Sequence, residues 1–238
     1  LRKMAKKITL ASILTLYFLV LLVAIENGPL ISLQSLLLGI IGMVAIVISL
    51  SSIAERINLV DISDNFRKKH KGRVPLIGGI SLYISIVYGA IIFGVDDFYK
   101  IILISLVPII LVSIIDDIKG APISFRLVAQ IISSWIVILF SDIYLRELGG
   151  ILSSDIFQLN QFGIPFTIFA VVGMTNAFNM LDGMDGVTGS VSIVILLGIT
   201  TLLILGGQNF TWEFIIIIGL SIFLLFNLGI FTSKYKIF

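Results

Sequence analysis

Two adjacent carboxylates, Asp116 and Asp117, directly follow an apolar stretch of the chain. Neighbouring carboxylates repel each other, and an ionised group beside lipid is costly unless it is paired. A divalent cation or a bound cationic group would relieve both costs, so the pair predicts a site for a metal ion or another cation. The alternative is a solvated helix end, whose charges are screened by water and by Lys119. Asp96-Asp97 passes the same test, and we interpret that pair as solvated.

A second group of oxygen ligands lies in the segment Asn176-Ala-Phe-Asn179-Met-Leu-Asp182-Gly-Met-Asp185-Gly-Val-Thr-Gly189. Asn179, Asp182 and Asp185 are three residues apart, which places neighbouring members on adjoining parts of one helical face. Turns could deliver them equally well, because a glycine follows each aspartate. Carboxylate and amide oxygens suit Mg²⁺ or Mn²⁺, whose ligand shells substrate phosphates usually complete. The alternative is a tight polar hairpin, although a turn needs only one Asp-Gly pair.

A third group is a basic loop that could hold an anionic headgroup or nucleotide phosphates. Its basic residues are Arg67, Lys68, Lys69, Lys71 and Arg73, with His70 among them. The run Pro75-Leu-Ile-Gly78-Gly79 follows, and its glycines would let backbone N–H groups at a helix start approach a phosphate. The alternative is that a cytoplasmic loop is basic for reasons of membrane topology alone. We interpret His70, the single histidine, as an interfacial hydrogen-bonding group.

The elements that carry these residues are apolar enough to lie in a membrane. Hydrophobic residues make up 58% of the 238 residues and charged residues 13%, with a mean hydropathy of +1.15. Soluble domains are nearer ~45–50% apolar and about 25% charged. The chain has no cysteine, which excludes disulfides, iron–sulfur clusters and thiolate metal sites. The composition therefore predicts an integral membrane protein.

We predict an all-α, polytopic fold with about eight transmembrane helices and cytoplasmic active-site loops. Long apolar runs without strand-like alternation favour helices over a barrel. The predicted spans are residues 8–25, 30–54, 76–95, 101–115, 127–141, 162–181, 187–207 and 214–233. The fourth and fifth are short, so we expect flanking residues to extend them, with Lys100 or Arg126 reaching the interface. Two polar residues inside spans, Gln130 and Asn227, are predicted to hydrogen-bond across the bundle.

The basic residues predict the orientation of the chain. Eight crossings sort the connecting segments into two sets, and all 16 basic residues except Lys100 and Arg146 fall into the set that holds both ends. By the positive-inside rule that set is cytoplasmic. Six aspartates lie on the same side, so their loops could form one polar site at the inner membrane surface: Asp61, Asp64, Asp116, Asp117, Asp182 and Asp185.

In this order the motifs resemble the polyprenyl-phosphate N-acetylhexosamine-1-phosphate transferases. They are most similar to the bacterial branch that acts on undecaprenyl phosphate and GlcNAc-1-phosphate, rather than to the muramoyl-pentapeptide branch. The resemblance covers residues 57–238 as a membrane transferase domain, and residues 1–56 are a two-helix extension. The motifs are Leu59-Val-Asp61, Asn65-Phe-Arg67-Lys68-Lys69-His70 with Pro75-Leu-Ile-Gly78-Gly79, Asp116-Asp117, residues 176–186 and Asn227-Leu-Gly229.

The resemblance implies that a lipid phosphate attacks the β-phosphorus of a UDP-sugar, giving lipid-diphospho-sugar and UMP with Mg²⁺, or with Mn²⁺ in its place. It places the catalytic residues Asp116 and Asp117 by the lipid phosphate and Asn179, with Asp117, on the metal. Asp182 and Asp185 shape the nucleotide site. We assign the remaining substrate-binding residues as Asn176, Arg67, Lys68, His70 and Lys71.

The partners expected from the resemblance are UDP-N-acetylhexosamine, undecaprenyl phosphate, the lipid bilayer and a second copy in a homodimer, with no nucleic acid. The expected location is the bacterial cytoplasmic membrane. The product would feed a cell-envelope polysaccharide such as lipopolysaccharide or teichoic acid. Because a phosphate monoester has a second pKa near ~6, the lipid nucleophile is already largely ionised, and the aspartate pair should act by positioning rather than as a base.

The chain departs from the family at its C-terminal end. The family continues with a Gly-Asp-x-Gly-Ser motif and a histidine-rich loop, whereas this sequence ends at residue 238. We therefore expect a C-terminally truncated domain with little or no activity by itself. The alternative functions are a small-solute transporter and a non-catalytic membrane subunit. The predicted spans carry no charge, and the acidic groups gather at one face of the membrane. Both observations favour the enzyme over the transporter.

Overall fold

The computed structural model describes residues 33–56, 59–62, 73–149, 157–181, 186–230 and 237. The helices are α2 (Leu33–Arg56), α3 (Gly78–Phe93), α4 (Asp97–Ser105), α5 (Val107–Lys119), α6 (Ile123–Ser141), the 3₁₀ turn η1 (Asn160–Phe162), α7 (Gly163–Leu181), α8 (Val187–Leu205) and α9 (Thr211–Asn227). Two short strands, β1 (Val60–Ile62) and β2 (Arg73–Pro75), pair between α2 and α3. Two compact units result, one from Leu1–Val95 with Met184–Phe238 and one from Asp96–Gly183.

The all-α membrane fold class is confirmed. Among the described residues, five helices are long and apolar enough to cross a membrane: Gln34–Arg56, Asp97–Lys119, Ile123–Ser141, Asn160–Leu181 and Val187–Leu205. Gly78–Phe93 and Thr211–Asn227 are apolar but shorter. The predicted span at residues 8–25 lies outside the described residues, so the number eight stays a prediction.

The two short predicted spans are extended as expected. The fourth runs over α4 and α5 from Asp97 to Lys119, with a break at Leu106 between them. Pro108 stands in the first turn of α5, where its missing N–H costs no helical hydrogen bond. The fifth begins at Ile123 rather than at residue 127, so Arg126 lies inside helix α6.

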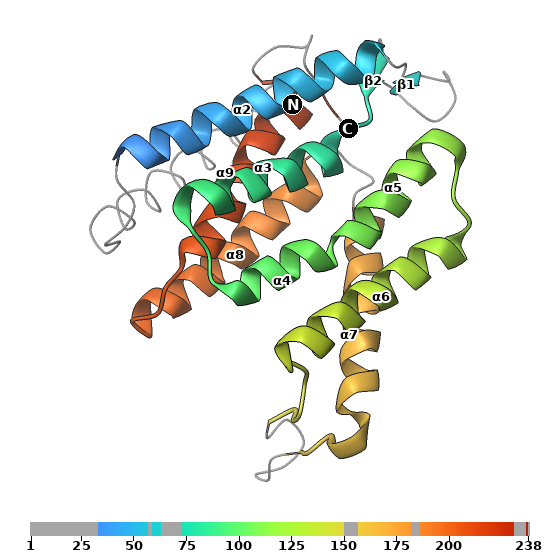
Figure 1. Cartoon of the computed structure of the whole chain (residues 1–238), viewed down its shortest axis with the longest axis vertical. Coiled ribbons are helices and arrows are strands. Elements are labelled where there is room, and N and C mark those ends of the chain that lie inside the picture. The colour runs from blue at the N-terminus through green and yellow to red at the C-terminus, as the bar shows by residue number, and fades with distance from the viewer. Residues whose placement is uncertain are drawn as a thin grey trace, which may run out of the picture. The chain divides into compact units, whose positions relative to one another are not determined.

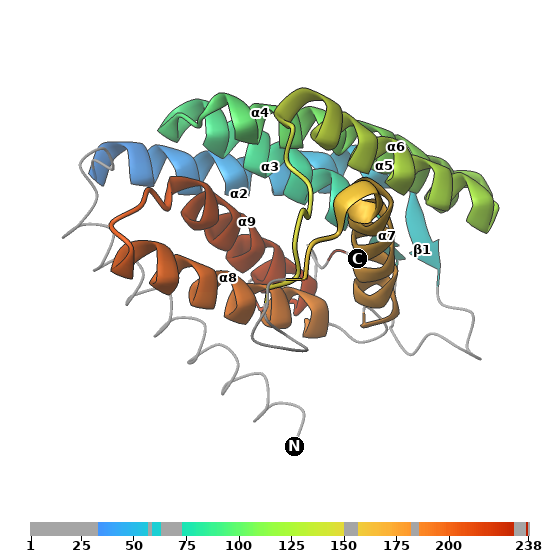
Figure 2. The same cartoon turned by 90° about the horizontal axis from the view of Figure 1, so that it is seen from below.

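In the first unit, α2 packs along α3, and both α3 and α8 pack on α9 (Figures 1 and 2). Glycines allow the close approach: Gly42 faces the ring of Tyr88, whose hydroxyl donates to the Leu38 carbonyl at 3.1 Å. Gly89 lies against Met43 and Ile215. A side chain at either glycine would push these helices apart, so the small size of glycine determines how closely the helices pack. The predicted domain boundary at residue 57 stays a prediction.

The strand pair holds the two ends of the basic loop together. β1 and β2 are antiparallel, with Val60 opposite Pro75 and Ile62 opposite Arg73. The Leu76 N–H donates to the Leu59 carbonyl at 3.2 Å, which continues the pairing towards the start of α3. The loop itself, residues 63–72, lies outside the described residues.

In the second unit, α5 and α6 form a helical hairpin, and α6 also packs against α4 and α7 (Figure 1). Gly120 ends α5 with φ 72°, a conformation that residues with a Cβ rarely adopt. Pro122 then precedes α6. The loop of the hairpin is therefore only three residues long, which fixes the end of α5 beside the start of α6.

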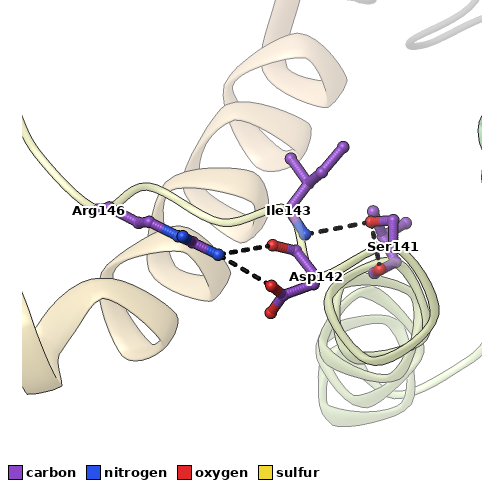
Figure 3. A network of polar contacts seen from close by, with 5 residues as sticks. Ser141, Asp142, Ile143 and Arg146 are labelled. Carbon is purple, nitrogen blue, oxygen red and sulfur yellow. Dashed lines mark hydrogen bonds and ion pairs between the residues drawn. The ribbon is translucent and has the colours of Figure 1, made fainter.

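The other end of α6 carries an exposed polar network (Figure 3). Asp142 caps the helix in the left-handed conformation, and its carboxylate accepts a 2.9 Å hydrogen bond from Arg146. The Arg146 guanidinium also lies 4.8 Å from the centre of the Tyr144 ring. Ser141 Oγ accepts from the Ile143 N–H at 3.3 Å. These side chains stabilise the helix end at the surface.

Candidate active site

A cavity of about 210 Å³ lies within the second unit, between α5, α6 and α7. It is lined by Ile109, Val112, Ser113, Asp116, Asp117, Arg126, Ala129, Gln130, Thr175, Asn176 and Asn179. Small-molecule sites are typically ~300–1,000 Å³. The described cavity is therefore large enough for a phosphate group with a cation, but it is only part of a site for a sugar nucleotide.

Four of the predicted site residues meet at this cavity, although they come from two helices that are far apart in the sequence. Asp116 and Asp117 lie in the last turn of α5, and Asn176 and Asn179 lie near the end of α7. The other predicted residues are outside the described residues, and their placement stays a prediction: Asp182, Asp185, Arg67, Lys68, His70 and Lys71.

Both carboxylate oxygens of Asp116 are engaged. Oδ1 accepts from the Ala121 N–H at 2.6 Å, and Oδ2 forms an ion pair with Arg126 Nη1 at 3.3 Å. The Asp116 main-chain carbonyl accepts from the Gly120 N–H at 2.8 Å. Asp116 thus binds the turn of the hairpin and the first turn of α6 at once. Its contacts are those of a residue that holds the wall of the cavity in place.

Asp117 differs from its neighbour. It lines the cavity, yet within the described part of the chain its side chain makes no hydrogen bond and no ion pair. Lys119, the other charged residue of this turn, forms no ion pair with a described residue either. Asp117 is therefore the carboxylate of the pair that remains available to a cation or a substrate.

Arg126 is a residue of the cavity that the sequence did not reveal. The sequence placed it at the membrane interface, whereas its side chain is 38% exposed and faces Asp116 across the hairpin. A guanidinium carries five N–H donors, so one ion pair leaves donors for a phosphate. The available signal was its spacing of four residues from Gln130, which puts both on one face of α6.

Gln130 is hydrogen-bonded across the bundle, as predicted. Its Oε1 accepts from Asn176 Nδ2 at 2.9 Å, which joins α6 to α7. Asn227 does not follow the prediction: its Nδ2 donates at 3.1 Å to the Ile237 carbonyl, further along the chain, rather than to another helix. The reason is that Asn227 is the last residue of α9, and the Ile237 carbonyl lies within its reach.

The donor chemistry of the cavity fits a hard divalent cation. Carboxylate, amide and hydroxyl oxygens are present, and these are the ligands of Mg²⁺ and Mn²⁺. Among the described residues there is no cluster of three or more His, Cys, Asp and Glu residues that could hold a metal. A cation in this cavity would therefore need neutral oxygens beside Asp117, and Asn176 and Asn179 are placed to supply them.

Comparison with known proteins identifies relatives of this chain. The chain is 35% identical over 192 residues to the undecaprenyl-phosphate alpha-N-acetylglucosaminyl 1-phosphate transferase of Escherichia coli (strain K12), covering 78% of this chain and 51% of that protein. It is 34% identical over 208 residues to the Haemophilus influenzae transferase of the same name, covering 86% and 58%. The chain thus spans about half the length of these curated relatives.

Residues 99–238 match Glycosyl transferase family 4, and this region includes every residue that lines the cavity. The match extends over more than half of the chain, and the resemblance stated from the motifs is confirmed. The chain belongs to Glycosyl transferase family 4.

Proposed function

We propose that the protein transfers N-acetylglucosamine-1-phosphate from a UDP-sugar to undecaprenyl phosphate and releases UMP. The observation that carries this proposal is the cavity in which Asp116, Asp117, Asn176 and Asn179 meet beside Arg126. The relatives are named for the same acceptor and the same transferred group. Two phosphates must be brought together in this reaction, and the cavity combines a cationic side chain with oxygen ligands for a metal.

The reaction is a displacement at phosphorus. An oxygen of the lipid phosphate attacks the β-phosphorus of the UDP-sugar, and the bond from that phosphorus to the oxygen bridging to the α-phosphate breaks. UMP leaves with the bridging oxygen and its electron pair. A bound Mg²⁺, held by Asp117 and Asn179, would supply charge neutralisation for the phosphates.

The side chains of the cavity would then orient two anions that repel each other. Arg126 would bind a phosphate oxygen through its remaining N–H groups while Asp116 holds the guanidinium in place. Asp117 positions the metal rather than removing a proton, because the lipid phosphate is already largely ionised at neutral pH. The sugar-nucleotide end of the site would involve Asp182, Asp185 and the basic residues Arg67, Lys68, His70 and Lys71.

The membrane setting follows from the predicted orientation. The cavity is at the end of α5 that the charge distribution assigns to the cytoplasm, where a nucleotide sugar is available. The lipid acceptor would enter from the bilayer. A homodimer and a role in lipopolysaccharide or teichoic acid synthesis remain parts of the same proposal.

The test is a transfer assay in membranes from cells that express the protein. UDP-GlcNAc labelled in the sugar is supplied with undecaprenyl phosphate and Mg²⁺, and both lipid-linked label and UMP are measured. We expect equal amounts of the two products, and none when the metal is chelated. The matched control is D117N, which keeps the size of the side chain. Label that enters the lipid without UMP release, or no transfer at all, would refute the proposal; UDP-GalNAc as the better donor would correct only the sugar.

A further inference from the structure

Gln130 is almost fully buried at 7% exposure, yet it lines the cavity. Its neighbours on α6 are small residues, Ala129, Ser133 and Ser134, all of them buried. A buried amide is costly unless it is hydrogen-bonded, and Gln130 has its partner in Asn176 on α7. This pair joins α6 to α7, and both of its residues line the cavity.

The contacts fix which end of the Asn176 amide is free. Asn176 Nδ2 donates to the Val172 carbonyl at 2.8 Å and to Gln130 Oε1 at 2.9 Å, which uses both of its hydrogens. The Val172 carbonyl can only accept, so a rotated amide would place two acceptors against each other. The nitrogen of Asn176 must therefore face α6 and the preceding turn of α7.

The consequence is an oxygen without a partner. In the described part of the chain, Asn176 Oδ1 accepts no hydrogen bond, and Asn176 lines the cavity. Asn179 follows three residues later, on an adjoining part of the same helical face. Because a cation in this cavity needs neutral oxygens beside Asp117, the orientation of the Asn176 amide decides whether this residue offers the cation an acceptor or a donor.

We propose that Gln130 is a positioning residue, which holds the Asn176 amide so that Asn176 Oδ1 is presented to a divalent cation beside Asp117. The inference rests on the proposed function, because it assumes that the cavity binds the metal of that reaction. Without the Gln130 oxygen, the Asn176 side chain keeps only its bond within α7 and can leave the required orientation. Residues that orient a ligand in this way typically change metal affinity by about 10–100-fold.

The experiment is Mn²⁺ binding, followed by the loss of the free-ion electron paramagnetic resonance signal, with the purified chain in nanodiscs. Gln130→Met has a similar volume but no acceptor, and we expect it to raise the Mn²⁺ dissociation constant by about 10-fold. Gln130→Glu keeps an oxygen opposite Asn176 Nδ2 and should bind close to wild type. The matched control is Ser133→Ala on the same helix, since the Ser133 hydroxyl is buried without a partner among the described residues.

A double-mutant cycle separates positioning from general destabilisation. If Gln130 acts through Asn176, then Gln130→Met should have no further effect in the Asn176→Ala background. Gln130→Glu is also measured in the Asn176→Ala background. A gain in Mn²⁺ affinity that came only from the new charge would persist there. Melting curves of each variant report whether the fold is retained.

Wild-type affinity in Gln130→Met, or the same fold-change with and without Asn176, would overturn the inference. A wild-type chain that binds no Mn²⁺ would overturn it as well. The proposed function is tested separately, by transfer of labelled sugar to undecaprenyl phosphate. The wild-type protein alone decides that assay, so its outcome does not depend on the Gln130 variants.

Discussion

The protein has two pairs of adjacent aspartates in the same unit, and they lie in different environments. Asp97, in the first pair, is 93% exposed in its side chain and bonds to Lys100 three residues away at 2.7 Å. Asp116, in the second pair, is 28% exposed and reaches Arg126 across a helical hairpin. By sequence the two pairs look alike, because both stand at the edge of an apolar run.

The difference between the pairs is what surrounds them. An exposed ion pair within one helix contributes little, because water screens both charges. Asp116 lies at a cavity wall and pairs with Arg126 on another helix, so it restricts both helices at once. Its neighbour Asp117 stays available to a ligand. The lesson is that adjacent carboxylates indicate a site only when the fold encloses them.

The strongest test of this comparison is Asp117→Asn. The change keeps the side-chain size and removes the one carboxylate of the cavity that lacks a described partner. We expect transfer to fall by about 1,000-fold, since the proposed metal ligand loses its negative charge. The measurement is UMP release from pH 6 to 9. Activity that returns at high pH would contradict the positioning role and support a general base.

Arg126→Gln should have the next largest effect. It removes the arginine cation of the cavity and leaves Asp116 without its ion-pair partner. We expect kcat/KM to fall by about 100-fold, as for a lost charge-assisted contact with a phosphate. Arg146→Gln is the matched control, because its ion pair with Asp142 lies at the surface. Equal losses in the two variants would show that the cavity gives Arg126 no special role.

Asp116→Asn should be milder than either. The amide oxygen can still accept from the Ala121 N–H, but the charge opposite Arg126 is lost. We expect about a 10-fold loss of transfer and about 1 kcal/mol less stability, measured by kinetics and thermal unfolding in the same detergent. If this variant is as inactive as Asp117→Asn, the two carboxylates share one role and the distinction drawn between them is wrong.

Asp97→Asn completes the comparison with the smallest effect. The bond to Lys100 is lost, but both side chains are largely surrounded by solvent. We expect transfer to stay within about 2-fold of wild type and the unfolding temperature to shift by less than about 2 °C. A large loss of transfer here would mean that the first pair also serves the reaction.

Much of the fold could be predicted because the membrane restricts it. Apolar runs separated by short polar segments are enough to place helices at seven of the eight predicted spans, since backbone groups in lipid must be paired within each helix. The partners of charged residues at the helix ends were less predictable. Arg126 is an example, because only the packing of α5 against α6 brings its side chain to Asp116.

Four residues that line the cavity were predicted through their types, whereas the contacts between the cavity residues were not. Carboxylate and amide oxygens gather in two short segments of the sequence, and this pattern identified Asp116, Asp117, Asn176 and Asn179. Gln130 was read correctly as a bond across the bundle, but nothing in the sequence shows that its partner is a residue of the cavity. Such a contact joins residues 46 positions apart, and only packing of α6 against α7 creates it.

The sequence by itself determined that this is a helical membrane protein, which family motifs it carries and which oxygen ligands it has. Those properties depend on composition and local order, which a single chain displays directly. The tertiary structure decided which aspartate pair faces a cavity, which of its two carboxylates is already engaged, and which arginine and glutamine accompany them. These outcomes depend on burial and on distances between helices, so they exist only once the helices have packed.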